Sequence, residues 1–155
     1  MERYSSEHNE RLTSLLSTPA GHMNSPAPSA PIQPLRLLVV DDEPSIREVL
    51  TMYFTEDGHT VGTACDGEDG LQAFIHGEWD VVLTDRVMPH RTGDQLAAEI
   101  RKIDATIPII LVTGFADLAS YAEGKSPFDR VVRKPFTRES LRAAISHAAH
   151  LLAAC

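Results

Sequence analysis

The sequence is poor in aromatic residues and cysteine, and it has no excess of basic charge. Aromatic residues make up only 6% of the 155 residues, so we expect an aliphatic core. The two cysteines, Cys65 and Cys155, are too few and too far apart for a disulfide framework or a zinc site. We expect Cys65 to be a small core residue. The formal charge of −8 argues against a general nucleic-acid surface and against binding to an anionic membrane.

Long apolar runs and secretion signals are also missing from the sequence. No stretch is long and apolar enough to span a bilayer, and the N-terminus lacks the basic-then-apolar order of a signal peptide. These absences favour a cytoplasmic location. A chain of this length is most simply one domain with an appendage.

The composition changes near residue 35, which predicts a boundary between an extension and a domain. Residues 1–18 are predicted to be a short helical extension with Leu12, Leu15 and Leu16 on one face. Residues 19–34 hold five of the ten prolines among alanine and serine, which is typical of an extended linker. We therefore expect the folded domain to cover residues 35–155.

From residue 35 onward, short aliphatic runs alternate with segments of helical periodicity. The expected strands are 35–40, 60–65, 80–84, 108–113 and 128–133. The expected helices follow each strand, with Asp94 and Thr137 as candidate N-caps of the third and last. Apolar residues at helical spacing, including Leu71, Phe74 and Ile75, are expected in the core. This alternation predicts a doubly wound α/β sandwich around a parallel five-stranded sheet.

Polar residues interrupt the chain at the ends of four predicted strands. Asp41 and Asp42 follow the first strand, Asp85 the third, Thr113 ends the fourth and Lys134 follows the fifth. In a sheet of order 2-1-3-4-5 these side chains would converge on one cleft, where ligands of such folds bind.

The carboxylates of this cluster would repel one another unless a cation neutralised them. With no histidine or cysteine beside them, the expected cation is Mg²⁺, which prefers carboxylate oxygens and accepts phosphate oxygens. A nearby lysine and a threonine hydroxyl would suit the oxygens of a phosphoryl group. Transfer of that group depends mostly on positioning and on neutralising charge, and a carboxylate can be the nucleophile.

Four separated segments resemble the receiver domain of two-component response regulators: VVDDEPSIREVL, DVVLTDRVMPHRTG, ILVTGFAD and VVRKPF. The resemblance extends from about residue 35 to the end of the chain and implies a flavodoxin-like fold. It implies that Asp85 accepts a phosphoryl group from a phosphohistidine of a sensor histidine kinase or a histidine phosphotransfer protein. The chain would then be a signalling phosphoacceptor rather than an enzyme, capable at most of self-phosphorylation from small phosphodonors and of autodephosphorylation.

The same resemblance implies a role for each site residue. Asp42 and Asp85 would bind Mg²⁺ directly, together with the backbone carbonyl of Val87, and Asp41 would act through a metal-bound water. Glu43 is expected to be a helix-start residue rather than a ligand.

The other side of the site would contact the phosphoryl group. Lys134 would pair with it and with Asp85, and Thr113 would bond one of its oxygens and report phosphorylation by moving. A cis peptide bond before Pro135 would direct the lysine, since cis bonds are nearly confined to X–Pro.

The sequence departs from the receiver pattern in three places. Val131 stands where receivers carry an aromatic switch residue, which puts the usual switch in doubt, and Phe128 or Tyr121 would be only speculative substitutes for it. The helix expected over 116–123 lacks a clear apolar stripe. The third departure is Arg86, directly after the phosphoacceptor, together with Phe115, two residues beyond the threonine. These two residues either modulate the access of water to the acyl phosphate or are ordinary residues at the edge of the site.

The output of such a domain is open at this stage. The sequence has no segment that resembles a DNA-binding module, and the motifs particularly resemble receivers attached to hybrid sensor kinases. We therefore expect output through phosphorylation-dependent protein interaction, homodimerisation or onward phosphoryl transfer, without nucleic acid or membrane.

Two other functions compete with this one. A pseudo-receiver that acts only as an interaction module is favoured slightly by Val131 and disfavoured by the intact Asp42, Asp85, Thr113 and Lys134. A phosphatase of the haloacid dehalogenase type needs a second aspartate two residues after the first, where this chain has Val87.

Other polar groups are expected to be surface features. They are the pair His147 and His150, the loop residues His90 and Arg91, and the acidic helix start at 66–69.

Overall fold

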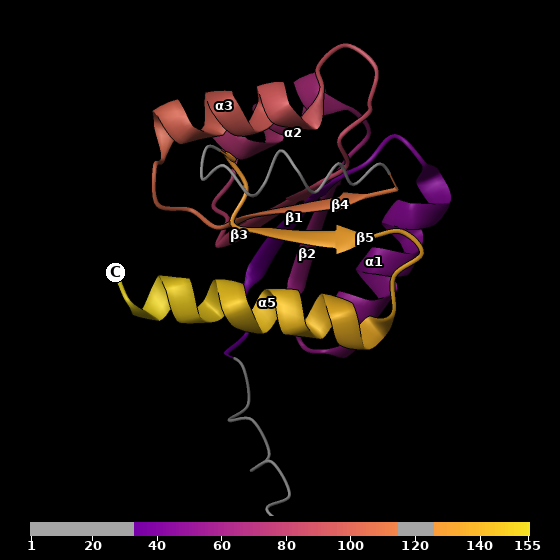
Figure 1. Cartoon of the computed structure of the whole chain (residues 1–155), viewed down its shortest axis with the longest axis vertical. Helices are drawn as coiled ribbons and strands as arrows, with labels where there is room; N and C mark the ends of the chain where they lie inside the picture. The colour runs from indigo at the N-terminus through magenta and orange to yellow at the C-terminus, as the bar shows by residue number, and fades with distance from the viewer. Residues whose placement is uncertain (1–32, 115–125) are drawn as a thin grey trace, which may run out of the picture. The chain divides into compact units, whose positions relative to one another are not determined.

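The computed structural model describes residues 33–114, in which strand and helix alternate from β1 to β4, and residues 126–155, which hold β5 and α5 (Figure 1). The elements are β1 (Arg36–Val40), α1 (Pro44–Glu56), β2 (Thr60–Ala64), α2 (Gly67–His76), β3 (Val81–Thr84), α3 (Gly93–Ile103), β4 (Ile109–Thr113), β5 (Arg130–Arg133) and α5 (Arg138–Ala153). The predicted strands are all present, and each is one or two residues shorter than expected.

The five strands form one parallel sheet in the order β2-β1-β3-β4-β5, which confirms the predicted topology. Strands β1 and β3 are neighbours, with Val40 paired to Thr84 at their last residues. Asp41 and Asp85 therefore leave the sheet side by side, and the N–H of Asp85 donates to the carbonyl of Val40 at 3.0 Å. The sheet order alone brings two distant acidic segments together.

Helices cover both faces of the sheet, and each face has its own aliphatic core (Figure 1). Alternate strand residues such as Leu38 and Val82 face α2 and α3, whereas Leu37 and Val81 face α1 and α5. All four of these residues are fully buried. Burial on both faces explains why the strands are apolar runs without polar alternation.

The beginning of α3 differs from the prediction, because Thr92 and not Asp94 is the N-cap. The hydroxyl of Thr92 accepts from the N–H of Gln95, and the side-chain oxygen of Gln95 accepts from the N–H of Thr92. This reciprocal capping box satisfies two N–H groups that a single aspartate could not. Asp94 lies in the first turn and pairs with Arg86 instead. At α5 the predicted cap, Thr137, is confirmed.

Two residues predicted to be core are exposed. Ile75 is 51% exposed, because α2 packs through the stripe of Gly67, Gly70, Leu71 and Phe74, and Ile75 falls beside that stripe. A Cβ at Gly70 would lie 2.8 Å from a methyl carbon of Val40, so α2 approaches the sheet closely and its buried face is narrow. Cys65 is also exposed, because the edge strand β2 ends one residue before it.

Three sequence predictions concern residues outside the described ranges. They are the helical extension over 1–18, most of the linker over 19–34, and the helix over 116–123. Among the described helices, none combines the length and the apolar character that a bilayer crossing requires.

Candidate functional site

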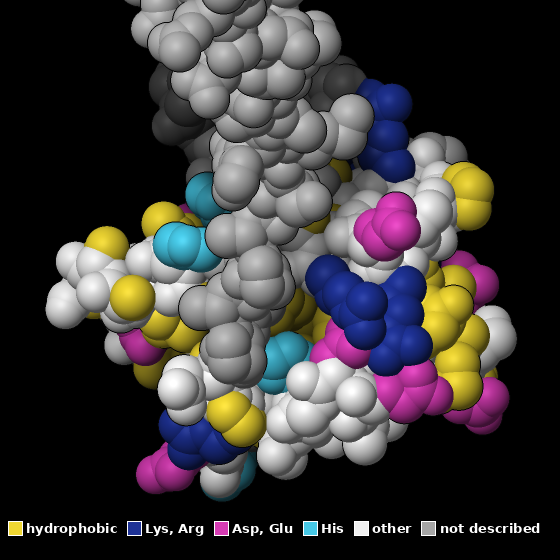
Figure 2. All heavy atoms as spheres, turned by 90° about the horizontal axis from the view of Figure 1, so that it is seen from below, with side chains coloured by type: hydrophobic (Ala, Val, Ile, Leu, Met, Phe, Trp, Pro, Cys, Tyr) yellow, Lys and Arg dark blue, Asp and Glu magenta, His cyan; other side chains and the backbone are white. Residues whose placement is uncertain are grey.

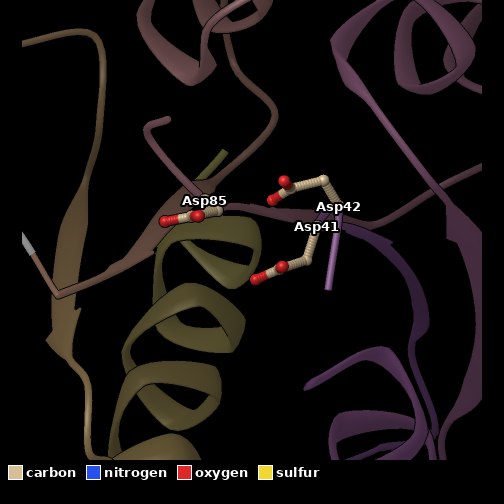
Figure 3. Close-up of side chains that lie close together, drawn as sticks. All are labelled: Asp41, Asp42 and Asp85. Atoms are coloured by element: carbon tan, nitrogen blue, oxygen red, sulfur yellow. The ribbon is translucent and has the colours of Figure 1, made fainter. Parts of the chain in front are cut away.

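The three aspartates predicted to form a metal site lie together beyond the ends of β1 and β3 (Figure 3). One carboxylate oxygen from each of Asp41, Asp42 and Asp85 lies within 4.8 Å of the others. Asp41 and Asp42 leave β1 next to each other, and Asp42 extends toward Asp85 (Figure 3). Asp41 and Asp85 are buried, with 1% and 8% of their surface exposed, whereas Asp42 is open to solvent. The cluster thus has a buried floor and an accessible edge.

Asp41 is held by the turn that begins α1. Its Oδ1 accepts from the N–H of Glu43 at 2.9 Å, and its backbone carbonyl accepts from Nη1 of Arg47 at 2.6 Å. Arg47 was not predicted to be a site residue, although its position in the sequence gives a signal. A basic residue in the first turn of a helix opposes the helix dipole, so it needs another partner. That partner is the carbonyl beside the acidic cluster.

Asp85 is fixed by contacts from its own segment. Its Oδ1 accepts from the N–H of Arg86 at 2.8 Å, and its backbone carbonyl accepts from the hydroxyl of Thr84 at 2.9 Å. Burial raises the pKa of the Asp85 carboxyl above its usual range, and nearby Asp41 adds to the rise. The Arg86 N–H and Lys134 lower the pKa without cancelling these effects. A cation bound beside Asp85 would therefore relieve this cost of burial.

Lys134 enters the cluster from the end of β5 and faces three carboxylates. Its Nζ lies 2.9 Å from Asp41, 3.5 Å from Asp85 and 3.7 Å from Glu43. Burial acts to lower the pKa of Lys134, but these carboxylates outweigh it and raise the pKa. The lysine is therefore a permanent cation of the site. The Lys134–Pro135 peptide bond is cis, which is the geometry expected from the resemblance.

Thr113 contacts Lys134 through the main chain. It is fully buried as the last residue of β4, and its backbone carbonyl accepts from the N–H of Lys134 at 2.9 Å. The two residues predicted to contact a phosphoryl group are thus joined through the main chain. Val87, whose carbonyl was predicted to bind the metal, lies on the loop after β3, and its side chain is 59% exposed.

The position that lacks the usual aromatic residue is occupied by a packed side chain. Val131 is half-buried and packs against the core cluster that also contains Phe128. Phe128 is itself a buried member of that core cluster, at 7% exposure. Tyr121 and Phe115 lie outside the described residues. Position 131 therefore holds a packed valine and not an aromatic side chain that could turn inward.

The remaining candidates are surface features. The Asp66 side chain accepts from the N–H groups of Glu68 and Asp69 and caps α2. His90 lies 3.8 Å from Asp66, and Arg91 pairs with Glu68. Within the described ranges, the aspartate cluster is the one group of three or more potential metal-binding side chains, and neither His147 nor His150 belongs to such a group.

The donor set of the cluster fits a hard divalent cation. All its side-chain donors are carboxylate oxygens, as Mg²⁺ prefers, and the exposed edge at Asp42 leaves room for water or phosphate oxygens. The three aspartate carboxylates and the Lys134 ammonium together carry a net charge of about −2. A divalent ion would neutralise them.

Comparisons with known proteins agree on one family. A family model described as the response regulator receiver domain matches residues 37–146. A probable transcriptional regulator, ycf27 of Cyanidium caldarium, is 39% identical over 110 residues, covering 70% of this chain and 44% of the relative. This chain therefore spans less than half the length of that relative.

Solved structures give the same result. A receiver domain from Clostridium thermocellum has a TM-score of 0.69 at 34% identity, covering 75% of this chain and 94% of that one. The response regulator TrrA from Thermotoga maritima, solved in complex with Mg²⁺–BeF, has a TM-score of 0.66 at 37% identity, covering 74% of this chain and 98% of that one.

Proposed function

The chain belongs to the response regulator receiver domain family, and on that basis we propose that it accepts a phosphoryl group on Asp85 in the presence of Mg²⁺. The observation that carries this proposal is the meeting of Asp41, Asp42 and Asp85 with Lys134 at the ends of β1, β3 and β5. A domain that only bound another protein would not need three acids and a lysine at one point.

The proposed reaction moves a phosphoryl group from a histidine to an aspartate. An Asp85 carboxylate oxygen attacks the phosphorus of a phosphohistidine and forms a P–O bond. The P–N bond breaks, and its electron pair returns to the imidazole nitrogen. Asp85 lies beside the exposed Asp42 yet is itself only 8% exposed, so its carboxylate has little competing hydration.

Mg²⁺, when bound, would neutralise the carboxylates and the oxygens of the incoming phosphoryl group. Asp42 and Asp85 are the proposed direct ligands with the carbonyl of Val87, and Asp41 would act through water. The burial of Asp41 behind the exposed Asp42 is consistent with that division. The TrrA complex with Mg²⁺–BeF supports the choice of cation for a related domain.

Lys134 and Thr113 are proposed to hold the phosphoryl oxygens on the side away from the metal. Lys134 is a permanent cation 3.5 Å from Asp85, near enough to contact a group attached there. Thr113 is joined to Lys134 through the backbone, so a shift of either would reach the other. We propose that Thr113 reports phosphorylation by moving, and that the movement does not use an aromatic residue at position 131.

The proposed partners are a sensor histidine kinase or a histidine phosphotransfer protein, which would supply the phosphoryl group. The curated relatives include transcriptional regulators about twice as long as the matched region. For this chain we propose output through protein interaction, homodimerisation or onward phosphoryl transfer. We also propose the cytoplasm as its location and residue 35 as the start of the domain.

A pure interaction module is the second candidate, and Val131 is the observation that favours it. Intact mass after incubation with Mg²⁺ and acetyl phosphate separates the two functions. The proposal predicts a gain of one phosphoryl group that does not form when the metal is chelated beforehand, and does not form in Asp85→Asn. An interaction module would give no adduct with any phosphodonor.

A further inference from the structure

The residue directly after Asp85 is tied to helix α3 by a two-point ion pair. Nε and Nη2 of Arg86 donate to Oδ2 and Oδ1 of Asp94 at 2.9 and 3.2 Å. The Arg86 side chain is only 24% exposed and that of Asp94 is 41% exposed. A paired arginine–carboxylate contact fixes direction as well as charge. It therefore restrains the orientation of the chain at Arg86.

Two backbone contacts anchor the same segment to the beginning of α3. The N–H of Gly93 donates to the carbonyl of Arg86 at 2.9 Å. A Cβ at Gly93 would lie 2.1 Å from the carbonyl oxygen of Asp85, so only glycine allows this close approach. Helix α3 thus begins in direct contact with the peptide that joins Asp85 to Arg86.

This segment carries two of the proposed metal ligands. The N–H of Arg86 donates to Oδ1 of Asp85 at 2.8 Å, and Val87, with the proposed carbonyl ligand, is the next residue. From this arrangement we infer that the Arg86–Asp94 pair is a positioning device. It holds the Asp85 carboxylate and the Val87 carbonyl in the orientation that binds Mg²⁺. The inference rests on the proposed function, because it takes Mg²⁺ as the cation.

The alternative role of Arg86 is purely electrostatic. The two roles predict opposite changes in Mg²⁺ affinity when Arg86 is removed. A guanidinium that acted only as a nearby positive charge would weaken the binding of a cation, so removing it would tighten Mg²⁺ binding. A positioning residue strengthens binding despite its charge, so removing it weakens Mg²⁺ binding. The direction of the change in Arg86→Ala therefore separates the two roles.

The test is calorimetric titration of the full chain with Mg²⁺ alone, without a phosphodonor. We expect Arg86→Ala and Asp94→Ala each to weaken Mg²⁺ binding about tenfold, as is usual for residues that orient metal ligands. The double variant should bind no more weakly than either single variant, because both remove the same contact. Arg86→Lys keeps the charge but not the two-point contact, so it should lie between the wild type and Arg86→Ala.

Arg91→Ala is the matched control. Arg91 lies on the same loop, is 27% exposed, and pairs with Glu68 of α2 at 2.9 Å, away from the Asp85–Arg86 segment. Its removal should leave Mg²⁺ affinity within about twofold. Thermal unfolding without metal identifies variants that fail to fold, and Mg²⁺ affinities are compared among the variants that do fold.

The outcomes distinguish the inference from the proposed function. Unchanged or tighter Mg²⁺ binding by Arg86→Ala would overturn the positioning role and leave the proposed function intact. Equal weakening by Arg91→Ala would also overturn it, since the effect would belong to the loop as a whole. A wild-type chain that binds no Mg²⁺ would overturn the proposed function itself.

Discussion

The Nζ of Lys134 lies 2.9 Å from a carboxylate oxygen of Asp41 but 3.5 Å from Asp85. Lys134 therefore pairs more closely with Asp41, the more deeply buried of these two acids. A phosphoryl group on Asp85 would therefore share the Lys134 ammonium with Asp41. This geometry couples the acids of the proposed metal site to the proposed phosphoacceptor through one side chain.

Replacing Lys134 tests that coupling. Lys134→Met should lower the free energy of unfolding by about 3 kcal/mol, because Asp41 would keep a buried charge without its cationic partner. It should also slow the formation of the acetyl phosphate adduct more than tenfold, because a charge that stabilises the transferring group is lost. Urea unfolding and intact mass measure the two effects.

Lys102→Met is the control for the lysine substitution. Lys102 pairs with Glu99 on the exposed side of α3, and its side chain is 69% exposed. Exposed pairs of this kind contribute about 0–1 kcal/mol, so stability and adduct formation should hardly change. Equal effects of the two substitutions would contradict the account of Lys134.

Neutralising Asp85 should stabilise the fold. Its pKa is raised in the folded state, chiefly by burial, so the ionised carboxylate opposes folding at neutral pH. In the wild type this cost is present above the folded pKa and is relieved as the pH falls through that value. We expect Asp85→Asn to raise the melting temperature without metal by a few degrees at pH 7.

The gain from Asp85→Asn should shrink as the pH falls and Asp85 becomes protonated in the wild type. Thermal melts in chelator over a pH series measure it. A lower melting temperature for Asp85→Asn at pH 7 would show that the contacts of Asp85 outweigh its burial cost.

The ion pairs that join α1 to α5 should make the fold sensitive to acid. The Arg142 guanidinium, followed by that of Arg138, holds the pKa of Asp57 at about 2, below the usual 3.8. Figure 2 shows, on one face of the molecule, basic side chains in contact with acidic ones. The stability from Asp57 is complete above about pH 3.8 and is lost as the pH falls toward 2.

Asp57→Asn should therefore cost roughly 1 kcal/mol at pH 7, after allowance for the partial exposure of the arginines. The difference from the wild type should be much smaller at pH 2, near the folded pKa of Asp57. Urea unfolding at both pH values measures it, and a difference that stays constant with pH would assign the effect to packing instead.

The sequence carried enough information to predict the sheet order and the membership of the acidic cluster. Strand-end residues of parallel strands necessarily meet at one edge, so Asp41, Asp42, Asp85 and Lys134 could be placed together without coordinates. Their contacts could not be predicted in the same way. The choice of Lys134 between Asp41 and Asp85 depends on sub-ångström placement of the chain after β5.

The features that were predicted wrongly depend on how closely elements approach. Ile75 has the spacing of a core residue, but Gly70 lets α2 approach the sheet so closely that the buried face of the helix is narrow. At α3, Asp94 is a good N-cap by residue type, yet Thr92 forms a capping box with Gln95. Asp94 is thereby left to pair with Arg86, which residue names alone do not indicate.

The most direct test of the central claim identifies the phosphorylated residue chemically. Wild-type protein is incubated with Mg²⁺ and acetyl phosphate, reduced with borohydride, which converts an aspartyl phosphate to homoserine, and mapped by peptide mass spectrometry. We predict homoserine at position 85, with Asp41 and Asp42 unmodified. Homoserine at either of those positions, or at none, would contradict the assignment of Asp85 as the phosphoacceptor.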